Sequence, residues 1–237
     1  MKIIVSLVSL IAFLLVALPG PLYKYDVVDL GTAFTGFKFG VFAGIAALVL
    51  LGIQVLFKRD TVRLSSALTA VILSAIAIIV PLSMMNTAKS VPPIHDISTD
   101  LVNPPEFVAI APLRADAPNP ATYDGIETAE QQRKAYPELQ TLTYTQPKSE
   151  LMEATEQAVD KLGWELINTD TSAGIIEATD TTTWFGFKDD VVIRVTDEGS
   201  ERLVDIRSKS RVGGSDLGTN AERIHDFIKE LDEVFSD

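Results

Sequence analysis

Three apolar segments occupy the first 85 residues and constrain the fold of this chain more than any other feature. They lie at residues 3–18, about 36–57 and about 64–85, and the second and third have about 22 residues each. At about 1.5 Å per residue, a helix of that length crosses the hydrocarbon core of a bilayer, which is roughly 30 Å thick. We therefore predict a three-helix membrane anchor over residues 1–85.

The first apolar segment has two interpretations, a retained span or a cleaved signal peptide. It follows Lys2 and ends at Pro19-Gly20-Pro21, which stops a helix. Its exit through Leu18 and Pro19 fits a small-x-small cleavage site poorly, and two more apolar segments follow. These features favour a retained span.

Basic residues predict the orientation of the spans. The connector between the second and third segments carries Lys58, Arg59 and Arg63, whereas the connector at 20–35 has one Lys against two Asp. By the positive-inside rule, the N-terminus and the turn at 58–63 are cytoplasmic. We expect a multi-pass protein of the inner (plasma) membrane, with everything after Met85 in the periplasm or outside the cell.

Small residues repeat every four positions in the second and third segments, which lets two helix backbones approach closely. The repeat residues are Gly36, Gly40, Gly44, Ser66, Ala70 and Ser74. They are interpreted either as the packing surface of a compact three-helix anchor or as a docking stripe for another membrane protein. No Asp, Glu, Arg or His lies in the middle of a segment, which argues against a transporter or a pump.

The charge of the chain divides at the same boundary. Residues 1–85 carry six basic and three acidic side chains, whereas the rest carries 14 basic and 29 acidic ones. An acidic domain repels phosphate, so no nucleic-acid partner is expected. The chain has no Cys and two His, and it has no metal-binding or nucleotide-binding motif. We therefore expect neither a metal nor a cofactor.

Proline dominates the segment that follows the anchor. Eight of the twelve prolines lie between residues 90 and 137. Because proline removes backbone donors, we predict that residues 86–144 form an extended strap that wraps the following domain, without regular structure over most of its length. One or two helical turns are expected at 129–136, begun by a capping box of Thr128 and Gln131.

Residues 145–237 are predicted to form a small α+β domain of order α-β-β-β-β-α. A helix at 147–163 with Ser149 as its cap opens the domain, and a helix with a capping box of Thr219 and Glu222 closes it. The strands are expected at 164–168, 174–183, 190–196 and 202–211. Short connectors favour an antiparallel four-stranded sheet, with both helices on one face of a two-layer sandwich.

Alternation in the strands predicts a second, charged face of the sheet. Val191, Ile193 and Val195 share one face, so Arg194 points to the other, where Arg207 and Arg211 also lie. Two interpretations stay open. The face is either a solvated or strap-covered surface with cross-strand ion pairs, or it is a surface that binds an anion or carboxylate.

Three stretches of this half are IHDISTDLVNPPEF at 94–107, ATDTTTWFGFKDDVVIRV at 178–195 and VDIRSKSRVGGSDLGTNAERI at 204–224. Together they resemble the domain of unknown function 1499 family over roughly residues 90–235. The resemblance implies a bacterial source and a domain placed after membrane spans, and it implies no established activity. The matching positions are His95, Asp96, Asp100, Asn103, Pro104, Trp184, Phe185, Asp189, Asp190, Arg194, Arg207, Ser210, Arg211, Asp216, Gly218, Asn220 and Arg223.

A catalytic role has one weak set of candidates, His95 with Asp96 and Asp100. A base oriented by a carboxylate would fit this spacing, and so would local hydrogen bonding at a bend. The glycine-rich segment at 212–218 joins a strand to a helix, where Asp216 is expected to accept from free backbone N–H groups instead of leaving room for phosphate.

Trp184 and Phe185 lie between two predicted strands, where large apolar side chains are either buried or exposed to a partner or to lipid. Burial under the strap is favoured, because Asp189 and Asp190 follow and would disfavour an anionic membrane surface. The full set of candidate ligand-binding or partner-binding residues is Trp184, Phe185, Asp189, Asp190, Arg194, Arg207, Arg211 and Asp216.

The leading functional hypothesis is a non-enzymatic binding or accessory module. It would be integral to the lipid bilayer, face away from the cytoplasm, and work as a subunit or partner of another membrane or envelope protein. The alternative is a hydrolase-like or anion-binding domain. That domain would use His95, Asp96 and Asp100 together with the face of Arg194, Arg207 and Arg211.

Overall fold

The computed structural model describes residues 2–235, which divide into two compact units. One unit comprises the residues up to Lys89 together with Thr183–Gly186. The other comprises Ser90–Thr182 and the residues from Phe187 onward. The tip of one strand connection, which carries Trp184 and Phe185, therefore belongs with the N-terminal helices.

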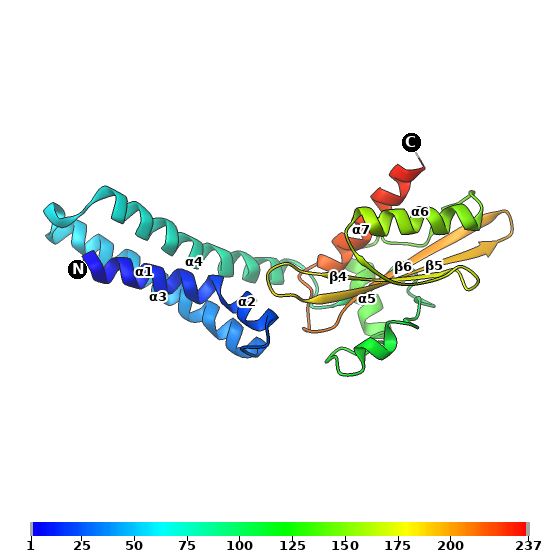
Figure 1. Cartoon of the computed structure of the whole chain (residues 1–237), viewed down its shortest axis with the longest axis horizontal. Coiled ribbons are helices and arrows are strands. Elements are labelled where there is room, and N and C mark those ends of the chain that lie inside the picture. The colour runs from blue at the N-terminus through cyan, green and yellow to red at the C-terminus, as the bar shows by residue number, and fades with distance from the viewer. Residues whose placement is uncertain (1, 236–237) are drawn as a thin grey trace. The chain divides into compact units, whose positions relative to one another are not determined.

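The N-terminal unit is helical (Figure 1). Its elements are α1 (Lys2–Ala17), α2 (Pro19–Lys24), α3 (Leu30–Phe57), η1 (Arg59–Thr61) and α4 (Leu64–Ser90). Three stretches are long and apolar enough to cross a membrane, namely Ile3–Lys24, Leu30–Phe57 and Leu64–Ser90. By length and composition, the chain is therefore a multi-pass membrane protein.

Helix α3, the second of the three long apolar helices, begins six residues before the predicted start at Gly36. Its cap is Asp29, whose side chain accepts a hydrogen bond from the backbone N–H of Thr32 at 2.9 Å. The capping carboxylate satisfies an N–H group that the first turn of a helix leaves free. The third helix continues past the predicted end at Met85 to Ser90, with Pro81 inside it.

The glycines of α3 lie at helix contacts inside this unit. A Cβ on Gly40 would lie 2.6 Å from Cγ2 of Val16 in α1, and a Cβ on Gly44 would lie 3.2 Å from the carbonyl oxygen of Ser74 in α4. Gly36 likewise faces α1, at Leu15 and Pro19. Gly36 and Gly40 therefore allow α1 to approach α3 closely, and Gly44 allows α4 to do so. Small residues have this role where helices pack in a bilayer.

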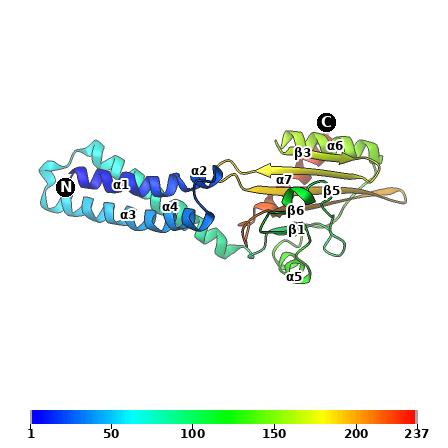
Figure 2. The same cartoon turned by 60° about the horizontal axis from the view of Figure 1, so that its bottom comes forward.

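The C-terminal unit is built on an antiparallel sheet of six strands, within an α+β fold. The strands are β1 (Asp96–Ser98), β2 (Leu142–Tyr144), β3 (Glu165–Asp170), β4 (Ile175–Thr181), β5 (Lys188–Glu198) and β6 (Glu201–Ser210). Their order is β1-β6-β5-β4-β3, and β2 also pairs with β6. Figure 2 shows β1 at one edge and β3 at the other.

The α+β class is confirmed, and the prediction of four strands was wrong. The two additional strands come from the Pro-rich segment, which was expected to lack regular structure. Each has three residues, too few to show an alternating pattern, and each pairs with β6: Ile97 lies opposite Ser208, and Thr143 lies opposite Leu203. A short segment of this kind becomes a strand because a long neighbour offers it unpaired backbone groups.

The helices of this unit are η2 (Ala111–Arg114), α5 (Ile126–Ala135), α6 (Lys148–Lys161) and α7 (Thr219–Val234). The three predicted helix caps were wrong. Helix α5 starts after Gly125, α6 after Pro147 and α7 after Gly218, each without a side-chain cap from that residue. Gly125 and Gly218 both have a φ of 87°, a conformation that a glycine adopts at low cost.

Helices α6 and α7 cover one face of the sheet (Figure 1). Helix α5 lies beside the β1 edge (Figure 2), where Gln132 forms hydrogen bonds with the backbone of Ser98. The stripe predicted for β5 is confirmed, since Val191, Ile193 and Val195 all lie in this core. Trp164 stacks on Phe227 of α7 with 6.0 Å between ring centres. The fully buried side chains of this core include Leu151, Ala158, Ile176, Ile193, Ile206, Ile224, Phe227 and Leu231.

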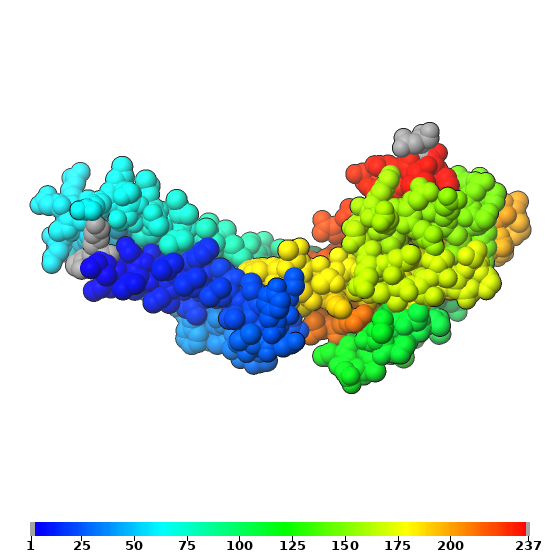
Figure 3. Space-filling model, in the orientation of Figure 1, coloured from blue at the N-terminus to red at the C-terminus, as the bar shows by residue number. Residues whose placement is uncertain are grey.

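The opposite face of the sheet is covered by the Pro-rich segment, called the arm (residues 90–144) from here on. Phe107 and Ile110 of the arm form a small apolar cluster with Val192 of β5. In Figure 3 the green atoms of the arm lie against the yellow and orange atoms of the strands. The arm, and not solvent, is therefore the immediate neighbour of this face.

Candidate functional site

The sheet face under the arm, called the arm face, is lined by charged residues. Those on β4, β5 and β6 that are at most 3% exposed are Glu177, Asp190, Asp205, Arg207 and Lys209. A charge buried to this extent is costly unless it is paired and hydrogen-bonded. The partners of these five residues therefore decide what the face can do.

Asp96 of β1 is the partner of two buried cations. Arg207 donates from Nε and Nη2 to the two carboxylate oxygens of Asp96, at 2.8 and 2.9 Å, and Lys209 Nζ lies 3.1 Å from Oδ2. The remaining donors of Arg207 reach the carbonyl oxygens of Pro105 and Ala121, at 3.1 and 3.0 Å. This fork-to-carboxylate pair ties the arm to β6 at several points.

Two aromatic rings of the arm enclose Arg207. Its guanidinium carbon lies 4.9 Å from the ring centre of Phe107 and 5.3 Å from that of Tyr123, within cation–π range. Burial, followed by the nearby charge of Asp96, raises the pKa of Tyr123 to about 12. The tyrosine therefore stays neutral and acts as a packing residue.

His95, Asp96 and Asp100, the candidate catalytic residues, are paired with different residues in the structure. The Nε2 atom of His95 lies 3.2 Å from Asp124, a residue that the sequence analysis did not single out. Asp124 also accepts from Lys209 Nζ at 2.6 Å, while Asp96 is bound to Arg207. Asp100 accepts a hydrogen bond from Arg194. Each of the three candidates therefore has a different partner.

Asp190 joins two arginines. Arg114 of η2 donates to its Oδ2 at 2.7 Å, and Arg211 donates to both of its oxygens at 2.8 Å. Thr179 of β4 adds a fourth hydrogen bond at 2.7 Å. Arg114 is 2% exposed and also reaches the carbonyl oxygens of Lys209 and Ser210.

Glu177 binds the backbone of the arm. Its Oε1 accepts from the N–H groups of Val108 and Ile110 at 2.9 and 3.1 Å, and its Oε2 accepts from that of Ala109 at 2.7 Å. The carboxylate thus satisfies three consecutive donors that proline-rich chain leaves outside any sheet. Only residues 67 to 69 positions apart meet here, so no local sequence signal marks the contact.

Arg194 sits at the more open end of the arm face. It donates to Asp205 at 2.7 Å, to Asp100 at 2.9 Å and to the carbonyl oxygen of Asn103 at 2.9 Å. Burial acts to raise the pKa of Asp100, but the N–H groups of Asn103 and Val102, together with Arg194, hold it below its ordinary value. Asp100 is therefore ionised at neutral pH, and its ion pair with Arg194 attaches the arm to β5.

Asp189 points to the helix-covered face, whereas its neighbour Asp190 points to the arm. It pairs at 2.8 Å with Arg223 of α7, which also binds Asp180 at 2.7 Å. Asp216 accepts from the N–H groups of Gly218 and Asn220, at 2.8 and 2.9 Å, where the loop enters α7. Burial raises the pKa of Asp216 despite these two hydrogen bonds.

Trp184 and Phe185 lie in the helical unit, and the arm does not cover them. Phe185 is buried, with ring centres 5.9 Å from Phe37 and 6.0 Å from Tyr23. Trp184 stacks on Phe37 at 5.6 Å, and its indole N–H donates to the carbonyl oxygen of Ala17 at 3.2 Å. The predicted burial is confirmed for Phe185, but the prediction that the strap covers this pair was wrong, because residues of the N-terminal helices surround it.

Comparisons with known proteins give one result. Within residues 2–235, no three His, Asp or Glu side chains converge as a metal-binding group would. No curated protein matches the chain. The family model described as "Protein of unknown function (DUF1499)" matches residues 96–231, more than half of the chain and nearly all of the sheet domain. The chain belongs to the DUF1499 family.

Proposed function

We propose that the chain is a membrane-anchored accessory or binding module without catalytic activity of its own, with its sheet domain outside the cytoplasm. One observation carries the proposal: the candidate catalytic and anion-binding groups bind the arm and each other. Arg207 makes contacts of 2.8–3.1 Å with Asp96, Pro105 and Ala121. A catalytic group must reach a substrate, whereas these groups support the fold.

The arm is the proposed recognition surface for a protein partner. Its inner side is fixed by the ion pairs of the arm face, while its outer side exposes large apolar side chains. These are Val102, Val108, Leu113 and Ile126, exposed by 81, 67, 54 and 80%. A fixed backbone that presents apolar side chains binds at a lower entropic cost than a mobile one.

Cross-linking from the arm tests this function. A photoreactive residue at Ile126, in the full chain in its native membrane, is expected to give an adduct with a second membrane or envelope protein, identified by mass spectrometry. The matched control carries the same residue at Lys229, whose side chain is 72% exposed on α7. Adducts with only this chain, or equal yields from both positions, would contradict the proposal.

The alternative, a hydrolase-like domain, makes a different prediction for His95. If His95 acts as a base, His95→Ala removes function in a deletion-rescue assay while the protein accumulates normally. The accessory module predicts rescue by His95→Ala, because the lost contact is a single half-buried pair with Asp124.

The proposed orientation can be tested with cysteine labelling, because the natural chain has no Cys. Asp60→Cys in η1 and Lys134→Cys in α5 each place one thiol at an exposed position. A membrane-impermeant maleimide added to intact cells is expected to label Lys134→Cys at once and Asp60→Cys only after lysis. The reverse pattern would refute the orientation derived from Lys58, Arg59 and Arg63.

A further inference from the structure

We propose that the turn between α3 and α4 binds the phosphodiester group of an anionic phospholipid, with Arg63 as the main ligand and the hydroxyls of Ser6 and Ser66 as further donors. The site lies entirely within the helical unit. It holds in either orientation of the chain, because both leaflets of a bilayer present phosphodiester groups.

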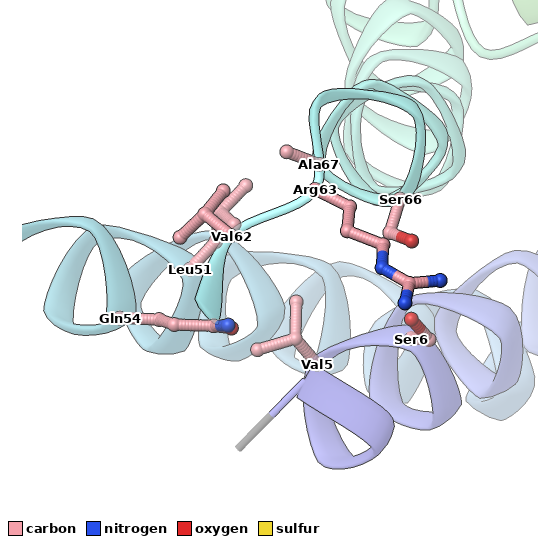
Figure 4. Close-up of a pocket in the computed structure, with 8 residues that line it drawn as sticks. All are labelled: Val5, Ser6, Leu51, Gln54, Val62, Arg63, Ser66 and Ala67. Atoms are coloured by element: carbon pink, nitrogen blue, oxygen red, sulfur yellow. The ribbon is translucent and has the colours of Figure 1, made fainter. Parts of the chain in front are cut away.

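A pocket brings these side chains together from three helices (Figure 4). Ser6 comes from α1, Gln54 from the end of α3 and Ser66 from the start of α4, while Arg63 immediately precedes α4. The open volume is about 210 Å³, solvent included. Its enclosed part has room for about one water-sized group, which suits a single phosphate oxygen with the rest of the headgroup at the mouth.

Arg63 differs from the arginines of the arm face in having no anionic partner. Among residues 2–235, the ion pairs of the structure include Arg114, Arg194, Arg207 and Arg211 of the arm face but not Arg63. Lys58 and Arg59 share its turn, where the only acidic residue is Asp60. A guanidinium matches two phosphate oxygens in its fork geometry, and basic pockets between membrane helices bind lipid headgroups.

Gln54, which lines the pocket, is hydrogen-bonded to the turn. Its side chain is 2% exposed and donates to Oγ1 of Thr61 at 3.1 Å, while Thr61 donates to the carbonyl oxygen of Lys58 at 2.7 Å. These two hydrogen bonds hold the turn between α3 and α4 in place without a ligand. The first N–H groups of α4, a helix of 27 residues, add a favourable dipole for an anion.

Apolar side chains around the turn favour a lipid over free phosphate. Leu56 and Phe57 at the end of α3 and Leu64 at the start of α4 are 78, 79 and 75% exposed. Such side chains beside a cationic turn suit acyl chains next to a headgroup. The combination distinguishes this turn from a site for a soluble anion.

The test measures lipid binding to the full, delipidated chain in detergent by native mass spectrometry. Wild type is expected to retain dioleoyl-phosphatidylglycerol in preference to dioleoyl-phosphatidylcholine. Arg63→Gln is expected to weaken phosphatidylglycerol binding about tenfold, the loss of one charge-assisted contact, and Arg63→Lys less. Ser66→Ala should weaken it about threefold, as for one neutral hydrogen bond.

Arg59→Gln is the matched control, because it removes a charge from the same turn without touching the pocket lining. It is expected to change phosphatidylglycerol binding by less than about twofold. Equal losses in Arg59→Gln and Arg63→Gln would overturn the site in favour of diffuse attraction, and so would unchanged binding in Arg63→Gln. Inorganic phosphate that stabilises the chain as much as phosphatidylglycerol would overturn the lipid as ligand.

Discussion

The two faces of the sheet are built from the same strands and held in opposite ways. On β6, Ile206 points to the helices and is surrounded by apolar side chains, whereas its neighbour Arg207 points to the arm and is surrounded by Asp96 and carbonyl oxygens. Both side chains are at most 1% exposed. One face is stabilised by apolar area removed from water, and the other by matched charges.

The difference predicts that the arm face is more sensitive to single substitutions than the helix-covered face. Apolar contacts are non-directional, so a core loses stability roughly in proportion to what is deleted. A buried ion pair is different, because removal of one partner leaves the other charged and without water. Single substitutions of the paired residues on the arm face should therefore destabilise the domain. The arm should separate from the sheet before the helix-covered core unfolds.

The largest expected effect comes from Asp96→Ala. It leaves Arg207 and Lys209 buried without their shared carboxylate, and we expect a loss of about 3–5 kcal/mol in the free energy of unfolding. The neighbouring Ile206→Val on the helix-covered face should cost only about 0.5–1.5 kcal/mol. Denaturant unfolding of the full chain in detergent measures both, with Trp164 as the reporter in a Trp184→Phe background.

The double replacement Asp96→Leu with Arg207→Met sharpens the same contrast. It removes both charges of the pair, so its loss should be smaller than that of Asp96→Ala alone. Lys209 keeps Asp124 at 2.6 Å in both variants. A double variant less stable than the single one would mean that the ion pair itself, and not the unpaired cation, accounts for the effect.

The helix-covered face was predictable from the sequence because its signal is local. The alternation of Val191, Ile193 and Val195 sets a face within five residues, and Phe227 and Leu231 repeat at helical spacing. The three apolar helices were predictable for the same reason, as was the role of Asp216 at the start of α7. In each case the determinant lies within a few residues of its effect.

The arm face was not predictable in the same way, because its partners are far apart in the sequence. Asp96 and Arg207 are 111 positions apart, and Arg114 and Asp190 are 76 apart. Alternation placed Arg207 and Arg194 on this face but could not pair them. The strands β1 and β2 were missed because a three-residue segment has no period of its own, and Trp184 was misplaced because its neighbours belong to the N-terminal helices.

The second prediction concerns the attachment of the arm at Glu177. Glu177→Gln places an NH₂ group against the N–H of Ala109 or of Val108 and Ile110, so at least one donor loses its acceptor. We expect a loss of about 2 kcal/mol. Hydrogen exchange should rise at residues 108–110 before it rises in α6 or α7. Equal acceleration in both places would contradict a separately held arm.

The third prediction uses pH to separate the two faces. The folded pKa of Asp100 lies below its ordinary value of 3.8, so its contribution is present above that pH and is lost as pH falls through the folded pKa. Asp100→Asn should cost about 1 kcal/mol at neutral pH and less below pH 3.8. Unfolding curves from pH 7 down to pH 3 measure the difference, which should close on the acid side. A constant difference would show that packing, and not charge, matters at this position.

The smallest effect is expected for Asp197→Ala, which removes an ion pair of short distance but high exposure. Asp197 lies 2.6 Å from Arg202 across β5 and β6, and its side chain is 59% exposed. Water replaces the lost partner of an exposed charge, so the free energy of unfolding should change by less than about 0.5 kcal/mol. The pair is as short as any on the arm face, so distance alone predicts a loss as large as that of Asp96→Ala. A small loss would instead identify burial beneath the arm as the property that makes the charged face fragile, and a large one would remove the distinction between the buried pairs and the exposed ones.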